Sequence, residues 1–335
     1  MQVLIINQTQ VATLLPMNEC IAVMEDTFAA LARGQAILPL RPIMWLPEKV
    51  GALGMMPSYL ANIQRLGVKV ITVMPGNHGT PYDSHQGVVL LFEEKHGQLL
   101  AIIDATSITA IRTAAVSGIA TQLLARQDAD DLAILGSGTQ ARTHLDAMLC
   151  VRPIRRVRVW SRHEENARAF AERESKRHNI PIKVMPTAQT AVQDADLICT
   201  TTSAIEPILF GEWIAPGAHI NAVGSSVAHA RELDTNAMLK SKLFVDRRES
   251  TVNEAGDFLF PKKEGALGAD HIRGELGELL IGQIHGRTSP DEITLFKSLG
   301  LAIEDLAAAQ HIYTKALEKG IGLSVELGGG RDETA

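Results

Sequence analysis

The stretch that decides the fold is Asp131-Leu132-Ala133-Ile134-Leu135-Gly136-Ser137-Gly138-Thr139-Gln140-Ala141. Its apolar first half predicts a short buried strand, and Gly136-x-Gly138-x-x-Ala141 is typical of the glycine-rich turn of a dinucleotide-binding βαβ unit. Gly136 permits a tight turn, Gly138 lets the backbone approach a pyrophosphate, and Ala141 lets the next helix pack closely on the strand. The amino terminus of that helix favours phosphate. We therefore predict cofactor contacts from Gly136, Ser137, Gly138, Thr139, Gln140 and Ala141.

Strands and helices alternate after this turn, which predicts an α/β fold with a parallel sheet. The expected strands are 132–135, 157–160, 182–184, 196–200, 219–223 and 242–246, and the expected helices are 140–150, 164–177 and 188–193. The strand at 242–246 is expected to close the sheet. After residue 274 the pattern is helical, with a last helix at 303–319.

The chain before the turn predicts a different kind of unit. Apolar spacing indicates a helix at 16–31, and the expected strands are 2–6, 52–56, 68–73, 87–92 and 99–103. These strands would form a curved antiparallel α+β sheet. A further helix is expected at 109–124, and the C-terminal helix would pack back on this unit.

The composition of this 335-residue chain limits the kinds of partner that it is expected to bind. Lys plus Arg is 32 and Asp plus Glu is 38, giving a net charge of −6, which argues against nucleic acid or a membrane surface as the main partner. No apolar run reaches the ~20 residues of a membrane span. Residues 1–7 do not resemble a signal peptide. Cys20, Cys150 and Cys199 form no metal pattern and are expected to be buried free thiols in a reducing cytoplasm.

The end of the second strand of the βαβ unit, expected at 157–160, indicates whether the cofactor is NAD(H) or NADP(H). An NAD-specific site usually has a carboxylate at the end of this strand for the ribose 2′-OH. Here that position reads Trp160-Ser161-Arg162-His163, with no carboxylate. Ser161, Arg162 and His163 suit a 2′-phosphate, so NADP(H) is favoured. If Arg162 is only a solvated helix-start residue, NAD(H) is accepted too.

Three cations stand out before the turn: Arg41 between prolines, Lys69 inside the apolar run 68–71, and Arg112 in a helix. A lysine within a strand core is costly to bury unless it is paired or functional. One interpretation is a snorkelling lysine and two surface arginines. The other is a group that binds a substrate carboxylate, for which guanidinium geometry is well suited.

Four segments resemble the ornithine cyclodeaminase/mu-crystallin family: Thr109 to Ala115, Gly136 to Ala141, Phe210 to Gly224, and Leu295 to Asp305. They span nearly the whole chain in order. The resemblance implies a Rossmann NAD(P)-binding domain inserted in an α+β substrate-binding and dimerisation domain, and therefore a homodimer. The expected boundaries are 1–112 with 304–330 for the substrate domain and 113–303 for the Rossmann domain. Residues 331–335 are expected to be a disordered tail.

The resemblance also implies site residues. Arg41, Lys69 and Arg112 would hold the substrate carboxylate, and Ser84 and Ser225 would line the substrate pocket. The segments expected to line the nicotinamide contain Thr200, Thr201, Thr202, Val223, Gly224, Ser298 and Gly300. Lys69 and Arg112 are the expected catalytic residues. Lys69 is the expected proton donor, since burial would bring its pKa toward neutrality; water held by Ser84 or Ser225 is the rival.

At two positions this sequence differs from the cyclodeaminase pattern, and these differences limit the reactions that are expected. The cyclodeaminase pattern has an aspartate where this chain has Ser225, and a glutamate near the position of Gly54. Without these carboxylates, ornithine cyclisation is disfavoured. The expected function is NAD(P)H-dependent reduction of a small α-imino acid, foremost a cyclic ketimine such as Δ1-pyrroline-2-carboxylate or Δ1-piperideine-2-carboxylate. The alternatives are an alanine dehydrogenase or iminosuccinate reductase type of enzyme, and a low-turnover NADPH-dependent ligand-binding protein.

Overall fold

The computed structural model describes residues 1–77 and 80–328. The predicted tail, 331–335, lies outside the described residues. The chain divides into two units: the first comprises 1–112 and 301–335, the second 113–300. Within the described part of the chain, no helix is both long enough and apolar enough to cross a membrane.

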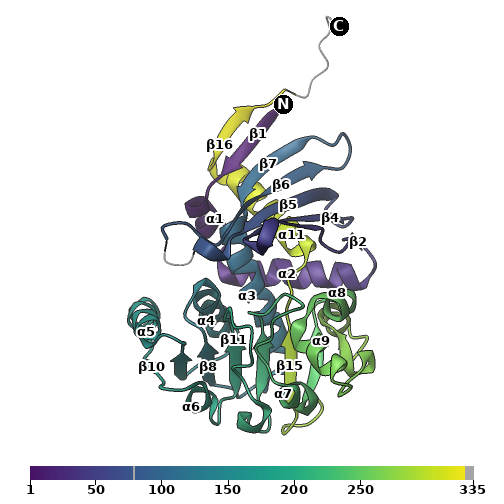
Figure 1. Ribbon diagram of the computed structural model, residues 1–335. Helices are drawn as coiled ribbons and strands as arrows, with labels where there is room; N and C mark the ends of the chain where they lie inside the picture. The colour runs from purple at the N-terminus through teal and green to yellow at the C-terminus, as the bar shows by residue number, and fades with distance from the viewer. Residues whose placement is uncertain (78–79, 329–335) are drawn as a thin grey trace, which may run out of the picture. The chain divides into compact units, whose positions relative to one another are not determined.

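The first unit is built on one mixed sheet (Figure 1). Its strands are β1 (Gln2–Ile6), β2 (Ala36–Ile37), β3 (Ile43–Trp45), β4 (Ala52–Leu60), β5 (Arg65–Val73), β6 (His85–Glu93), β7 (Leu99–Asp104) and β16 (Leu323–Glu326). They follow the order β16-β1-β7-β6-β5-β4-β2, with β3 also paired to β4. All these pairs are antiparallel except β1 with β7. The predicted antiparallel sheet is therefore confirmed, apart from this one parallel pair.

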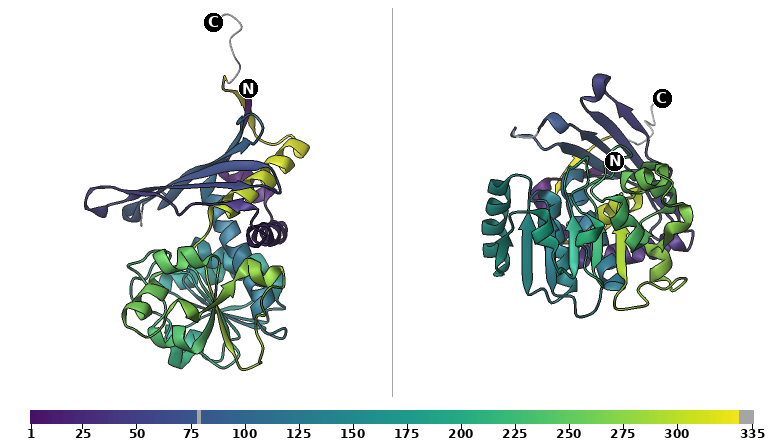
Figure 2. Two further views of the ribbon diagram at one scale, coloured as in Figure 1. Left: turned by 90° about the vertical axis from the view of Figure 1, so that its right-hand side faces the viewer. Right: turned by 60° about the horizontal axis from the view of Figure 1, so that its bottom comes forward.

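Helices complete the first unit. They are α1 (Gln8–Leu14), α2 (Met17–Ala32), α3 (Ala105–Leu124), whose first eight residues belong here, and α11 (Ala302–Lys319), with short turns of helix η1 (Pro47–Lys49) and η2 (Pro75–Asn77). The C-terminal helix α11 packs against β4, β5 and α2, as predicted. Figure 2 shows α11 lying along the sheet. Its buried residues include the charged Glu304 and Asp305.

The second unit is a parallel sheet of eight strands in the order β10-β9-β8-β11-β12-β15-β13-β14 (Figure 2). They are β8 (Asp131–Leu135), β9 (Arg156–Trp160), β10 (Ile182–Val184), β11 (Leu197–Thr200), β12 (His219–Ala222), β13 (Ser241–Val245), β14 (Ile272–Glu275) and β15 (Ile293–Lys297). Strand order reverses at β8, so that β9 lies on one side and β11 on the other. This is the arrangement of a dinucleotide-binding Rossmann fold, as predicted.

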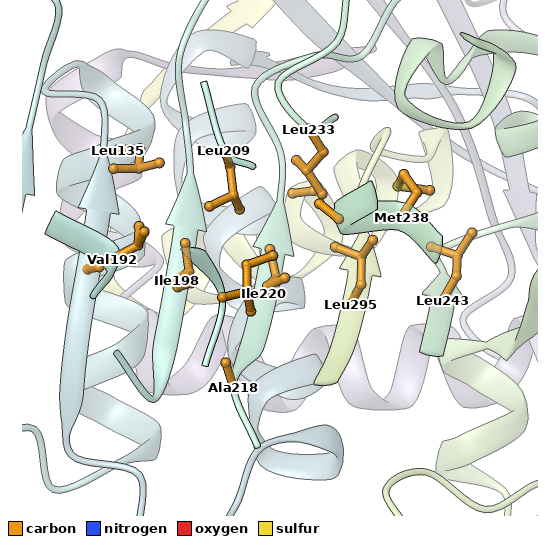
Figure 3. Packing of buried hydrophobic residues seen from close by; sticks show 14 of the residues in the cluster. Leu135, Val192, Ile198, Leu209, Ala218, Ile220, Leu233, Met238, Leu243 and Leu295 are labelled. Atoms are coloured by element: carbon orange, nitrogen blue, oxygen red, sulfur yellow. The ribbon is translucent and has the colours of Figure 1, made fainter. Parts of the chain in front are cut away.

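The helices of the second unit are α4 (Thr139–Val151), α5 (Glu164–His178), α6 (Ala188–Val192), α7 (Thr235–Lys240), α8 (Arg248–Glu254), α9 (Gly256–Lys263) and α10 (Leu276–Leu280), with η3 (Gly211–Trp213) and η4 (Ala269–His271). The strands carry mainly apolar side chains. Leu135, Ile198, Ile220, Leu295 and Leu243 come from five neighbouring strands and pack in one core (Figure 3). Burial of this apolar surface stabilises the sheet that carries the glycine turn.

Three expectations were wrong. The strand at 242–246 does not close the sheet, because β14 forms the edge beyond it. The segment of β15, expected to be helical, is a buried strand between β12 and β13. A short apolar run has no periodicity that separates a buried strand from a helix. Cys150 is exposed on α4, whereas Cys20 and Cys199 are buried; all three thiols are free.

Candidate active site

Two of the three predicted carboxylate-binding cations meet in the interior of the first unit. Lys69 on β5 and Arg112 on α3 are each 3% exposed. Lys69 Nζ lies 2.7 Å from Asp305 Oδ2 and donates to Thr109 Oγ1 at 3.3 Å. Arg112 Nε donates to Asp305 Oδ1 at 3.1 Å, and its Nη1 donates to Glu304 Oε2 at 2.7 Å. The snorkelling and surface interpretation is therefore wrong for Lys69 and Arg112.

The acidic partners change the electrostatics expected from the sequence. Two cations face two carboxylates, so this four-residue cluster is charge-balanced. Burial lowers the pKa of Lys69 to about 8, although Asp305 opposes that shift. Burial also disfavours charged Arg112, but Asp305 and Glu304 outweigh it and raise its pKa. Arg112 is thus a permanent cation, whereas Lys69 can gain and lose a proton near neutral pH.

Arg41 precedes β3 and Ser84 precedes β6, two strands that lie on opposite sides of the β4–β5 pair. Met55 N donates to Pro42 O, which places Arg41 beside Met56 of β4. Met56 pairs on its other side with Lys69 of β5, so Arg41 lies about two strand spacings, roughly 10 Å, from Lys69. Ser84 precedes β6, and its hydroxyl lies 3.0 Å from His85 Nδ1. Arg41 and Ser84 are both half-buried. Their binding of a substrate stays a prediction.

The glycine turn in the second unit has the geometry that a dinucleotide requires. Gly136 has φ +123°, and a Cβ there would lie 2.7 Å from Thr201 Oγ1 and 2.8 Å from Thr201 O. At Gly138 a Cβ would meet nothing within 4 Å, so the backbone borders open space. Gly138 is also the N-cap of α4 and offers no side-chain cap to the first N–H groups. These features fit the pyrophosphate of a dinucleotide.

The surroundings of the turn support this fit. Ser137, Gly138 and Thr139 line a cleft of about 480 Å³ together with Arg142, Arg173, Glu174 and Arg177. Ala141 is fully buried against the sheet, as its small size predicts. The buried Oε1 of Gln140 has no hydrogen-bond partner within the described residues, and neither does the buried Oγ of Ser298. Such atoms are available to a bound ligand.

The predicted 2′-phosphate residues lie at the same edge of the sheet. Trp160 pairs with Leu135, so Ser161 follows β9 beside the glycine turn. Ser137 Oγ donates to Ser161 Oγ at 3.0 Å. Arg162 and His163 are exposed, and Arg162 Nε lies 3.3 Å from His163 Nε2. An exposed guanidinium beside the turn is compatible with a ribose phosphate.

The segments predicted to line the nicotinamide end two neighbouring strands. Thr200, Thr201 and Thr202 come at the end of β11, and Val223 and Gly224 follow β12. Because β11 lies next to β8, these ends share the edge that carries the glycine turn. Gly300 N donates to Asp246 Oδ2 at 2.8 Å, which holds the segment containing Ser298 and Gly300. Ser225 is 2% exposed and its hydroxyl donates to Ala230 O.

Sequence reasoning missed the buried carboxylates that hold these residues. Glu304 and Asp305 hold the cations, while Glu232, Asp246 and Asp257 hold loops of the second unit. Glu304 and Asp305 occupy the first turn of a helix, where acidic residues are ordinary because they favour the helix dipole. Their proximity to Lys69 depends on pairing between segments more than 190 positions apart, which no local pattern reveals.

Comparison with known proteins shows the family of this chain. The family model described as "Ornithine cyclodeaminase/mu-crystallin family" matches residues 1–320. Ketimine reductase mu-crystallin of Mus musculus is 44% identical over 280 residues, which cover 84% of this chain and 85% of the mouse protein. These matches confirm the resemblance seen in the sequence.

Two solved structures are similar over nearly the whole chain. The Δ1-pyrroline-2-carboxylate reductase of Thermococcus litoralis, in complex with NADH and L-proline, has a TM-score of 0.94 and 42% identity, covering 96% of this chain and 100% of that one. An archaeal alanine dehydrogenase dimer with bound NAD has a TM-score of 0.92 and 32% identity, covering 97% and 99%. The chain therefore belongs to the ornithine cyclodeaminase/mu-crystallin family.

Proposed function

We propose that this protein is an NAD(P)H-dependent oxidoreductase that reduces a small cyclic α-imino acid, with Δ1-pyrroline-2-carboxylate as substrate and L-proline as product. The observation that carries the proposal is the full-length similarity to a reductase structure that holds NADH and L-proline. Two features of this chain support it: the buried Lys69–Arg112 group, and the open glycine turn at Gly136–Gly138.

The bound nicotinamide supplies the hydride, and the protein residues bind, orient and protonate. Arg41, Lys69 and Arg112 bind the substrate carboxylate and fix its orientation. Glu304 and Asp305 neutralise two of these cations, so the positive field that would disfavour an iminium ion is reduced. Lys69 Nζ donates the proton that the imine nitrogen needs, because its lowered pKa matches neutral conditions. Ser84 lines the substrate pocket, while the buried Ser225 shapes its loop.

We further propose that NADPH is preferred over NADH. The support is the sequence Ser161-Arg162-His163 at the end of β9, which offers a hydroxyl, a guanidinium and an imidazole where an NAD-specific site would offer a carboxylate. The exposed Arg162 guanidinium would pair with the 2′-phosphate.

The test of the proposed function is a substrate panel followed by loss of absorbance of the reduced nicotinamide. We expect turnover with Δ1-pyrroline-2-carboxylate, slower turnover with Δ1-piperideine-2-carboxylate, and a lower KM for NADPH than for NADH. Pyruvate plus ammonia, oxaloacetate plus ammonia, and ornithine with NAD are expected to be inactive. Turnover only with pyruvate plus ammonia would instead support an alanine dehydrogenase, and ligand binding without turnover would support a binding protein.

We also propose that the protein is a homodimer joined through the first unit. Seven large apolar residues on β2, β3, β4 and their connections are 37–66% exposed: Ile37, Leu40, Ile43, Met44, Trp45, Val50 and Met55. A cluster of this kind marks an interaction surface. The similar alanine dehydrogenase structure is a dimer.

A double substitution tests this surface. Met44→Asp with Trp45→Asp is expected to convert the protein from twice the chain mass to one chain mass in light scattering, because four charges would be buried across a symmetric interface. Leu239→Asp is the control, since Leu239 is 46% exposed on α7 of the other unit. An unchanged mass for the double variant would exclude this surface as the dimer interface.

A further inference from the structure

A single buried carboxylate in the second unit joins the two segments at the ends of β11 and β12. Glu232 is 0% exposed. Its Oε1 accepts from Thr202 N and from Thr202 Oγ1, each at 2.6 Å. Its Oε2 accepts from Thr200 Oγ1 at 2.8 Å and from Gly224 N at 2.8 Å. All four acceptor positions of the carboxylate are therefore used, two of them by backbone N–H groups.

A second buried carboxylate, Asp257, holds the backbone around Glu232. Asp257 Oδ1 accepts from Glu232 N at 2.8 Å and from Leu233 N at 3.0 Å. Asp257 Oδ2 lies 2.8 Å from Lys297 Nζ, and Lys297 also donates to Ser225 O at 2.5 Å. Lys297 and Asp257 are both 0% exposed. Lys297, at the end of β15, thus fixes the loop that contains Ser225, and Asp257 fixes the position of Glu232.

These contacts lie where a Rossmann fold binds its cofactor. In such folds the ligand binds outside the carboxyl ends of the strands, where the strand order reverses. The half on the β9 side of β8 receives the adenosine, so the half that begins with β11 receives the nicotinamide nucleoside. Thr200–Thr202 and Gly224 belong to this second half.

We propose that Glu232 is a positioning residue that shapes the nicotinamide-binding edge by tying Thr200–Thr202 to Gly224. This inference rests on the proposed function, because it assigns a role within the same cofactor site. Glu232 does not touch the reacting atoms; it acts through the backbone of the residues it holds. The carboxylate links the two segments in one geometry. Without it Thr202 N would lose its acceptor, and Gly224 N would keep only its bond to Thr200 O at 3.1 Å.

Glutamine cannot replace this carboxylate. One backbone N–H faces each oxygen, so the amide NH₂ of a glutamine would oppose an N–H in either orientation. The proposed test is therefore Glu232→Gln in the full chain, measured with two ligands. NADH contains both nucleoside halves, whereas ADP-ribose lacks the nicotinamide. We expect NADH affinity and kcat/KM for Δ1-pyrroline-2-carboxylate to fall about 10-fold, with ADP-ribose affinity changed less than about twofold.

Asp131→Asn is the matched control. Asp131 is a buried carboxylate at the start of β8, at the opposite end of the strands, where it pairs with Arg158 at 2.8 Å. We expect this variant to melt at a lower temperature while NADH and ADP-ribose affinities stay in their wild-type ratio. If Glu232→Gln does not fold, Thr200→Val serves instead, since the hydroxyl of Thr200 donates to Glu232 Oε2 and bonds no other group in the described part of the chain. It should lower NADH affinity about threefold with ADP-ribose unchanged.

Equal losses of NADH and ADP-ribose affinity, or unchanged NADH binding and turnover, would overturn the role of Glu232. The two binding measurements need no imino acid. If the wild-type protein reduces no substrate of the panel, the proposed function fails while the comparison of NADH with ADP-ribose still decides the role of Glu232.

Discussion

Lys69→Met is expected to lower kcat/KM for imino acid reduction by about 100-fold or more, with the affinity for NADPH unchanged. Methionine keeps much of the length of the buried side chain but removes the proton and the charge. Asp305 keeps its contact with Arg112 at 3.1 Å but loses the one with Lys69, so we expect a lower melting temperature, and turnover is measured well below it. Stopped-flow or steady-state reduction of Δ1-pyrroline-2-carboxylate measures the loss, and nucleotide fluorescence measures cofactor binding.

Lys315→Met is the control for Lys69→Met. Lys315 lies on α11 and is 2.6 Å from Glu19 Oε2, so it is a second ion-paired lysine of the same unit outside the cluster. This variant should retain wild-type turnover. Turnover of Lys69→Met within about threefold of wild type would exclude Lys69 as proton donor.

The pH profile gives a second readout for Lys69. Because the pKa of Lys69 is about 8 in the folded protein, kcat/KM for reduction should fall as pH rises above 8. Unfolding does not explain this loss. The pKa of Lys69 is lower in the folded than in the unfolded chain, where it is near 10.5, so between these values the unfolded chain binds more protons. The contribution of Lys69 to the free energy of unfolding therefore rises with pH across that window.

Gly138→Ala is expected to weaken cofactor binding at least 10-fold while leaving the melting temperature nearly unchanged. A Cβ at Gly138 meets no protein atom within 4 Å, and its φ of −86° suits alanine. The methyl group would instead occupy the space through which a pyrophosphate approaches the backbone. Equilibrium binding of NADPH and thermal unfolding of the same preparation separate these two effects.

Two further variants, Gly136→Ala and Gly76→Ala, are compared with Gly138→Ala. Gly136→Ala should destabilise the fold by about 1–3 kcal/mol, since its positive φ and its contact with Thr201 both oppose a side chain. Gly76 also has open space at its Cβ position, but it lies in the first unit, so Gly76→Ala should bind NADPH normally. Normal NADPH affinity in Gly138→Ala would contradict the placement of the pyrophosphate at this turn.

Local sequence patterns predicted the structural features that depend only on residues close together along the chain. A short apolar strand, a glycine turn and a helix are local features, so the Rossmann fold follows from residues 131–141 and the alternation after them. The absence of a carboxylate at 161–163 is likewise visible in the sequence. The buried strand β15 (293–297) was not, because so short a segment carries no periodicity that distinguishes a strand from a helix.

Tertiary structure decided how the charges pair. The sequence singled out Lys69 and Arg112 as cations that need a partner, but the partners Glu304 and Asp305 come from a helix near the other end of the chain. The same is true of Glu232, which reaches Thr200 and Gly224 through a loop. Burial of an ion is costly unless an opposite charge or hydrogen bonds compensate it, and compensation requires contact in space. The sequence by itself therefore determined the fold and the candidate cations, and only the tertiary structure determined which carboxylates hold them.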